Sequence, residues 1–250
     1  MPLARPTDLA RIAPTPRLRR RDALTVALVA PLVPNPARSS VVDESAAQRS
    51  FEKIFPSICS FSFDADDARK SSGFVWYADD RDYWIATSAR SVRSASSGVT
   101  VAFAGGGAAR LTSACEYFAD GNADVAFVRV PVDVVNAAGA HPMAAAIGTN
   151  DDVRVGRGVY AVGMEGGEAT LSSGVVSGLN RKIPLAGGGS LRGLIQTDAL
   201  VSDSTSGGPL CDGNGRVIGM CVSSGAGKKE PNGVNFAVPV DTVRFVAEKL

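Results

Sequence analysis

The chain has 250 residues, of which 45% are hydrophobic and 20% are charged, so it can bury a sizeable core and is not globally disordered. Its 27 glycines and 14 prolines indicate many turns rather than a helical bundle. The first 40 residues carry seven arginines and two aspartates, a net charge of +5, which leaves −4 on the rest of a chain whose total is +1. A slightly acidic folded part has no electrostatic reason to bind nucleic acid, so that class of function is excluded.

Residues 1–40 have the pattern of a targeting presequence that is cleaved from the mature protein. The apolar run at 23–33 would form a helix of only ~16 Å, too short for a stable membrane span of ~30 Å. The pair Arg20–Arg21 beside this run permits twin-arginine export. The long arginine-containing stretch before it indicates a bipartite signal, and a plastid thylakoid lumen fits best. A bacterial periplasm, a mitochondrion and a simple disordered arm remain as alternatives.

From about residue 51 onward, short β-rich runs alternate with glycine, aspartate and asparagine turns, a pattern typical of an all-β barrel or sandwich. A C-terminal helix is predicted with Asp241 as its N-cap and with Val243, Val246, Ala247 and Leu250 on one face. The less regular stretch 131–152 divides two half-barrels. The predicted strands are Gly73–Ala78, Tyr83–Ser88, Val99–Ala104, Val125–Val130, Gly158–Val162, Gly174–Leu179, Leu194–Asp198, Val217–Ser223 and Gly233–Val238.

The cysteines predict neither a metal site nor a cofactor site. Cys59, Cys115, Cys211 and Cys221 form no CxxC pair, and one histidine, His141, cannot complete a Cys/His zinc set. A turn at 212–215 would place Cys211 opposite a residue near 216, so Cys211 and Cys221 do not face each other. We interpret all four as small buried hydrophobic residues.

One segment, residues 196–220, carries a chemical motif. In it Ser206 is followed by Gly-Gly-Pro-Leu and lies between an extended strand and a hairpin. On such a tight bend the backbone N–H groups of Ser206 and of Ser204, two residues before it, can converge on one point. Such a pair of donors holds the oxyanion of an acyl-transfer intermediate, and the glycines permit the unusual backbone angles.

Together with this segment, six others resemble the HtrA/Deg family of serine proteases, in the family's order. The resemblance covers residues 51–250 and implies an all-β protein: two antiparallel β-barrels of the trypsin fold, a short C-terminal helix, an active site in the cleft between the barrels, and no cofactor. The first barrel would span about 51–135 and the second about 150–250. No PDZ domain follows, as in the short lumenal members of plastids. The six segments are 56–63, 71–92, 123–130, 153–163, 172–181 and 233–246.

The resemblance places Ser206 at the nucleophile and Asp124 at the acid that orients the base. The family's motif Thr-x-x-His-Val corresponds here to the segment Thr-Ser-Ala-Arg-Ser-Val, residues 87–92. Arg90 therefore stands where the family has its histidine. A guanidinium has only donors and a pKa above ~12, so it cannot accept the serine proton. An ion pair of Arg90 with Asp124 would take the place of the His–Asp pair. His141 is expected to be a surface-loop imidazole, with recruitment as a substitute base as the alternative.

A second departure affects the oxyanion hole. Ser204 stands where the family has glycine, and its Cβ restricts the backbone there. Asp203 adds a negative charge beside a site that would hold an oxyanion. Two changes in separate segments indicate relaxed selection on catalysis.

The substrate pocket is predicted to persist. Leu200, six residues before Ser206, would form its floor, and Met220, Cys221, Val222 and Ser223 its wall strand. An apolar floor would favour small aliphatic side chains.

Three functions are therefore considered. The first is a catalytically impaired pseudoprotease that acts as a non-catalytic subunit or peptide binder in protein quality control. The second is an active serine endopeptidase that uses Ser206 and Asp124, and the third is a chaperone-like binder of unfolded chains. The partners implied are unfolded or damaged polypeptides and other HtrA/Deg subunits in a homo- or hetero-oligomer based on trimers. Phe51 and Phe55 are candidates for that contact, with core packing as the alternative.

Overall fold

The computed structural model describes residues 43–63, 66–93, 98–111, 117–184, 189–223 and 233–250. The predicted presequence and Cys115 lie outside these residues. None of the helices in the described part is long and apolar enough to cross a membrane.

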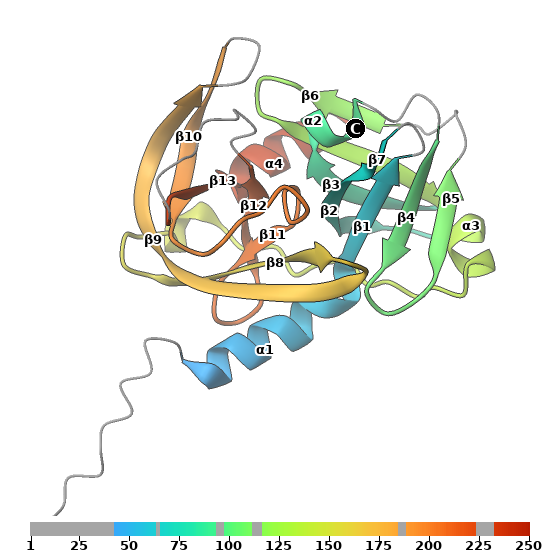
Figure 1. Ribbon diagram of the computed structural model, residues 1–250, viewed down its shortest axis with the longest axis horizontal. Helices are drawn as coiled ribbons and strands as arrows, with labels where there is room; N and C mark the ends of the chain where they lie inside the picture. The colour runs from blue at the N-terminus through green and yellow to red at the C-terminus, as the bar shows by residue number, and fades with distance from the viewer. Residues whose placement is uncertain (1–42, 64–65, 94–97, 112–116, 185–188, 224–232) are drawn as a thin grey trace, which may run out of the picture. The chain divides into compact units, whose positions relative to one another are not determined.

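Strands dominate the chain and form two curled sheets that lie side by side (Figure 1). The first is a seven-stranded antiparallel sheet with the order β5-β4-β1-β2-β3-β7-β6. Its strands are β1 (Ile58–Phe63), β2 (Asp66–Ala78), β3 (Asp82–Ser88), β4 (Val99–Phe103), β5 (Ala108–Leu111), β6 (Tyr117–Asp120) and β7 (Val125–Pro131).

The second sheet is a closed six-stranded barrel with the order β10-β13-β12-β11-β8-β9. Its strands are β8 (Gly158–Glu165), β9 (Glu168–Pro184), β10 (Ser190–Thr197), β11 (Pro209–Cys211), β12 (Val217–Val222) and β13 (Asn235–Pro239). The helical elements are α1 (Glu44–Ile54), η2 (Phe55–Ser57), α2 (Ala89–Val92), α3 (Val132–Ala137), η4 (Asn150–Asp152) and α4 (Val240–Ala247). The predicted all-β trypsin fold with a short C-terminal helix is confirmed.

Side-chain alternation explains how the sheets bury their core. In β4, Val99, Val101 and Phe103 are buried while the residues between them are half-buried, as expected for a strand with one face in a core. β12 is buried along its whole length: Cys221 packs in the barrel interior, whereas Met220 packs in the cluster that joins the two sheets. That joining cluster also contains Phe74 and Phe127 of the first sheet, so the two sheets share a core.

Each of the predicted strands falls on an observed one, but four observed strands were absent from the prediction. Three of these, β5, β6 and β11, have only three or four residues, too few for a clear alternation. The N-cap prediction for α4 is wrong, because the helix begins at Val240 directly after Pro239 and Asp241 lies in its first turn, paired with Arg244. Val243 and Val246 are buried as predicted, but Leu250 lies beyond the helix and is exposed.

Helix α1 precedes the predicted domain start and docks on the turn between β11 and β12. Its buried face consists of Ala46, Ser50 and Ile54, a spacing of four residues. The Ser50 hydroxyl donates to the Asp212 carbonyl at 3.0 Å. The turn also approaches α1 closely at Gly215. A Cβ on Gly215, whose φ is +75°, would lie 2.8 Å from Lys53 Cβ. Small residues on both sides therefore allow the close approach.

The Asp212 carboxylate stabilises this turn. It accepts hydrogen bonds from the backbone N–H groups of Asn214 at 2.9 Å and Arg216 at 3.0 Å, and it forms ion pairs with the guanidinium groups of Arg216 and Arg157. Burial opposes ionisation of Asp212, but the hydrogen bonds from Arg216 and Asn214 outweigh burial and hold the pKa of this carboxyl below its usual value.

Asp212→Asn is expected to lower the unfolding free energy at neutral pH by about 1–3 kcal/mol, because it removes the charge that the two guanidinium groups face. A depressed folded-state pKa stabilises the fold above the unfolded value of ~4, and this stabilisation disappears as the pH falls through the folded-state pKa. Urea unfolding between about pH 5 and pH 2 should therefore give a shallower loss of stability in the variant. The exposed Asp133→Asn is the matched control; equal pH profiles for wild type and Asp212→Asn would contradict this role.

Candidate active site

The fold brings two of the predicted site residues together at the same end of the first sheet. Arg90 lies in α2, which follows β3, and Asp124 directly precedes β7. β3 and β7 are antiparallel neighbours with Ser88 opposite Val125, so the residue after one strand and the residue before the other must be close. The strand pairing thus positions both side chains.

Arg90 and Asp124 form a bidentate pair. Arg90 Nε and Nη2 donate to Asp124 Oδ2 at 2.9 and 2.8 Å, and the Arg90 backbone N–H donates to Oδ1 at 3.0 Å. The Asp124 side chain is 1% exposed and that of Arg90 24%. The predicted ion pair is therefore present, in a geometry that a guanidinium can make and an ammonium cannot.

Ser88 completes the surroundings of Asp124. Its hydroxyl donates toward both carboxylate oxygens at 3.0 Å. Asp124 has a φ of +56°, in the left-handed region that aspartate tolerates better than most residues, and its carbonyl accepts the Ala89 N–H at 3.2 Å. The carboxylate is thus held by four donors and by a tightly bent backbone.

Ser206 lies in the turn between β10 and β11, and Ser223 connects it to Arg90. The Ser223 N–H donates to Ser206 Oγ at 3.1 Å, while the Ser223 carbonyl accepts from Arg90 Nη2 at 2.7 Å. The Ser223 hydroxyl also donates to the carboxylate of Asp203. The structure thus gathers Arg90, Asp124 and Ser206 into one hydrogen-bonded cluster. The Arg90 guanidinium offers only donors, so it has no acceptor for the Ser206 proton.

The turn itself uses the donor that an oxyanion would need. The Ser206 N–H donates to the carbonyl of Ser202 at 3.0 Å and more weakly to that of Asp203 at 3.3 Å. The Ser204 hydroxyl shares a hydrogen bond of 2.8 Å with that of Ser202. In this arrangement the Ser206 N–H is engaged by a carbonyl of the turn itself.

The residues predicted to form a substrate pocket lie in different surroundings. The Leu200 side chain is 68% exposed. Met220, Cys221 and Val222 are fully buried in the cores, and Ser223 is half-buried at the end of their strand. The pocket remains a prediction. Of the wall strand, Ser223 contacts the active-site cluster directly, and the Cys221 carbonyl accepts the N–H of Gly207, the residue after Ser206, at 2.8 Å.

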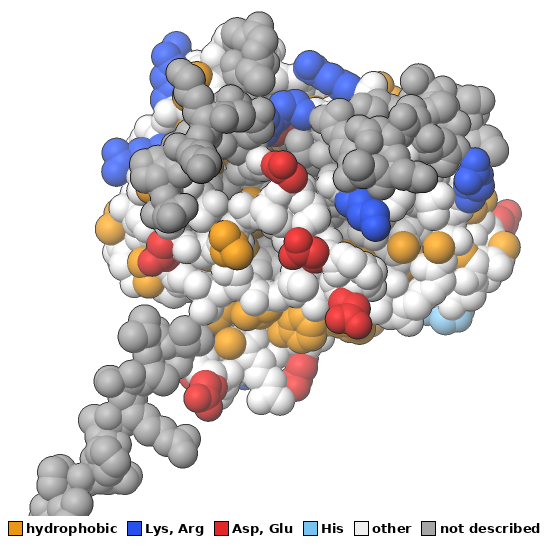
Figure 2. Space-filling view, viewed as in Figure 1, with side chains coloured by type: hydrophobic (Ala, Val, Ile, Leu, Met, Phe, Trp, Pro, Cys, Tyr) orange, Lys and Arg blue, Asp and Glu red, His pale blue; other side chains and the backbone are white. Residues whose placement is uncertain are grey.

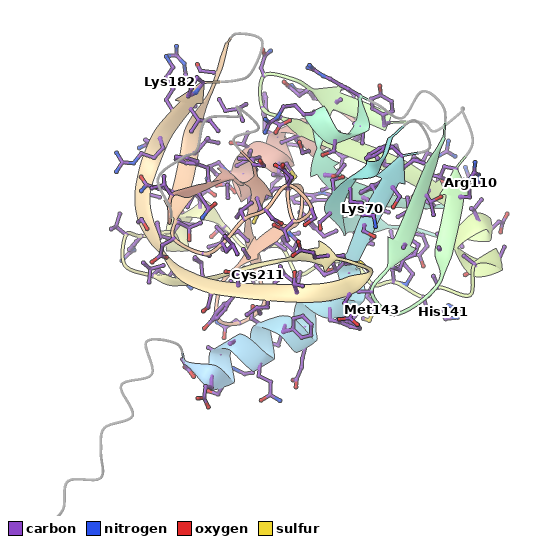
Figure 3. The ribbon with its side chains drawn as sticks, viewed as in Figure 1. Lys70, Arg110, His141, Met143, Lys182 and Cys211 are labelled. Atoms are coloured by element: carbon purple, nitrogen blue, oxygen red, sulfur yellow. The ribbon has the colours of Figure 1, made fainter. Side chains whose placement is uncertain are left out.

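His141 is exposed and lies away from this cluster. Figure 3 labels it at the lower edge of the first sheet beside Met143, whereas α2, which carries Arg90, lies at the upper edge (Figure 1). The expected surface-loop imidazole is confirmed, and the geometry gives no support to a role as substitute base.

No group of three or more histidine, cysteine or acidic side chains that could hold a metal ion occurs among the residues with described positions. Cys59, Cys211 and Cys221 are buried free thiols, as predicted. Burial raises the pKa of Cys221 to about 12 and that of Cys211 well above its usual value, so neither is a reactive thiolate at neutral pH.

Two site residues, Ser72 and Thr205, were not singled out by sequence reasoning. Ser72 lies in β2 and is fully buried; its hydroxyl donates to the Ser204 carbonyl at 2.8 Å and accepts from the Met164 N–H at 2.8 Å. Ser72 thus joins the first sheet, the barrel and the turn that carries Ser206. A serine before a glycine in a strand carries no signal of such a role in a single sequence.

Comparison with known proteins identifies the family of the chain. Residues 71–220 match the model of the trypsin-like peptidase domain family. The chain is 47% identical over 100 residues to Protease Do-like 5, chloroplastic, and 32% identical over 223 residues to Protease Do-like 1, chloroplastic, both of Arabidopsis thaliana. These alignments cover 39% and 83% of this chain, which spans only 31% and 48% of the two relatives.

Two solved structures have the same fold. The crystal structure of Deg5 aligns with a TM-score of 0.64 at 28% identity and covers 81% of this chain and 92% of that chain. The HtrA-type protease AlgW with a tripeptide aligns with a TM-score of 0.66 at 21% identity, over 81% of this chain and 62% of that one, and supports the fold alone. The chain belongs to the trypsin-like peptidase family and is a homologue of the Deg/HtrA serine proteases.

Proposed function

We propose that this Deg/HtrA homologue is a pseudoprotease that binds unfolded or damaged polypeptides as a non-catalytic subunit in protein quality control. The observation that carries the proposal is the bidentate Arg90–Asp124 pair, because it engages the acid of the triad with a side chain that cannot act as a base. Loss of the base of a serine triad costs ~10⁶ in turnover, about 8 kcal/mol of transition-state stabilisation.

Ser206 itself has no route for its proton in the described part of the site. Its Oγ accepts a hydrogen bond from the Ser223 N–H, and the nearby guanidinium offers only donors. The departures at Ser204 and Asp203 affect the oxyanion side of the same site. Base and oxyanion stabilisation are therefore both weakened, and this favours binding over cleavage.

We further propose a trimer-based homo- or hetero-oligomer with other Deg/HtrA subunits. Phe51 and Phe55 at the end of α1 pack together with a ring-centroid distance of 5.6 Å, are both only half-buried, and lie near the exposed Met143, whose N–H binds the Pro56 carbonyl. Apolar side chains gather on this face above α1 (Figure 2). The two chloroplastic relatives and the arginine-rich presequence favour import into a plastid and transfer to the thylakoid lumen.

Unfolded β-casein tests the proposal. We expect wild type to bind it without cleaving it and Ser206→Ala to bind it equally well; Arg90→His and Arg90→His/Ser204→Gly show whether catalysis can be restored. Co-purification of an intact Deg/HtrA subunit would support the subunit role, whereas suppression of aggregation that survives Ser206→Ala would favour a chaperone-like role. Cleavage by wild type that Ser206→Ala abolishes would overturn the proposal in favour of a serine endopeptidase.

A further inference from the structure

The turn that carries Ser206 is a single helical turn closed by its own side chains. The Ser202 carbonyl accepts the Ser206 N–H, the first bond of a helix. Ser202 Oγ accepts the Thr205 N–H at 3.2 Å, and Thr205 Oγ1 accepts the Ser202 N–H at 2.8 Å. This reciprocal pattern is that of a capping box, with threonine in the position where glutamate or glutamine is usual.

Ser72, in β2, donates two hydrogen bonds to carbonyl groups of the closed turn. Its hydroxyl donates to the Ser204 carbonyl and its backbone N–H donates to the Ser206 carbonyl at 2.9 Å. The same hydroxyl accepts the Met164 N–H from the barrel, so its donor and one acceptor are both engaged. Two carbonyls of the turn are thereby tied to buried groups that belong to the body of the fold.

We propose that Ser202, Thr205 and Ser72 are positioning residues that keep the Ser206 N–H inside the turn, so that the site takes neutral extended peptides and not tetrahedral anions. This rests on the proposed function and deepens it, because it supplies a second block on catalysis that is independent of Arg90. Release of the Ser206 N–H leaves the Ser202 carbonyl with only the Thr205 hydroxyl, at 3.2 Å, and strains the reciprocal Ser202–Thr205 bonds. A histidine at position 90 therefore restores the base but not the oxyanion donors.

Hydrogen exchange of the Ser206 amide tests this directly in the full chain labelled with ¹⁵N-serine. We expect a protected amide in wild type and exchange that is faster by between about twofold and 30-fold in Thr205→Val and in Ser202→Ala, the range that corresponds to loss of a helix cap. Thr100→Val, a half-buried threonine in β4, is the matched control and should leave Ser206 unchanged. An unprotected Ser206 amide in wild type, or no change in either variant, would overturn the proposal.

A peptide boronic acid provides a second readout, because its adduct with serine is a tetrahedral anion. Wild type and Arg90→His should bind the boronate no more tightly than the corresponding peptide amide, and Arg90→His/Thr205→Val should bind the boronate more tightly. If the single variant Arg90→His bound the boronate more tightly than the peptide amide, the proposed second block on catalysis would be wrong. Casein cleavage by wild type would refute the proposed function, and with a protected Ser206 amide it would also show that the closed turn is no block on catalysis. An unprotected amide without cleavage would refute only this inference.

Discussion

Gly207→Ala is expected to destabilise the folded chain by about 2–5 kcal/mol, the sum of ~1–2 kcal/mol for a left-handed non-glycine residue and ~1–3 kcal/mol for overpacking. Gly207 has a φ of +87° and lies against the first sheet directly after Ser206. An added Cβ would lie 2.3 Å from the Ser72 carbonyl oxygen, 2.5 Å from Thr87 Oγ1 and 2.9 Å from the Ser88 N. All three are fixed in strands, so the turn would have to move.

Equilibrium urea unfolding measures this effect, with Gly105→Ala as the matched control. A Cβ on Gly105 would meet nothing within 4 Å, and its φ is not positive. The control should retain wild-type stability within about 1 kcal/mol. A Gly207→Ala variant as stable as this control would mean that the close approach of turn and sheet does not contribute to stability.

Asp124→Ala is expected to cost about 3 kcal/mol, the lower end of the range for breaking a buried ion pair, because Arg90 is 24% exposed and water partly screens it. The substitution leaves the Arg90 guanidinium and the Ser88 hydroxyl without the carboxylate that both of them bind. Alanine also tolerates the φ of +56° less well than aspartate does.

Arg90→Ala provides the comparison for Asp124→Ala. It leaves the buried carboxylate with only the Ser88 hydroxyl and the backbone N–H of residue 90, so a loss of similar size, about 3 kcal/mol, is expected. Urea unfolding of both variants measures the two losses of unfolding free energy. If Arg90→Ala leaves the unfolding free energy unchanged, the pair is not a structural replacement for the His–Asp pair.

The central features of the site could be predicted because they depend on strand order and on residue type. Once Arg90 follows one strand and Asp124 precedes its antiparallel neighbour, their side chains must meet, whatever the details of the rest of the fold. The long strands were predictable for the same reason: alternation as in β4 reports burial on one face.

The missed features depend on contacts between segments that are distant in the chain. Helix α1 buries alanine, serine and isoleucine, a face too polar for an apolar periodicity to reveal, and its partner is a turn more than 150 residues away. Ser72 meets Ser204 across 132 residues. The capping box of Ser202 and Thr205 is local, but threonine in place of the usual glutamate or glutamine hides its sequence signature.

Reaction of Ser206 with a fluorophosphonate tests the proposed loss of catalysis most directly, because the reagent needs both an activated serine hydroxyl and oxyanion donors. Intact mass and peptide mapping after exposure of the chain to the probe would report labelling, with Ser206→Ala as the blank. We expect no adduct at Ser206 in wild type, and none or little in Arg90→His. Stoichiometric labelling of Ser206 in wild type would contradict the pseudoprotease proposal and would require a base other than the residue at position 90.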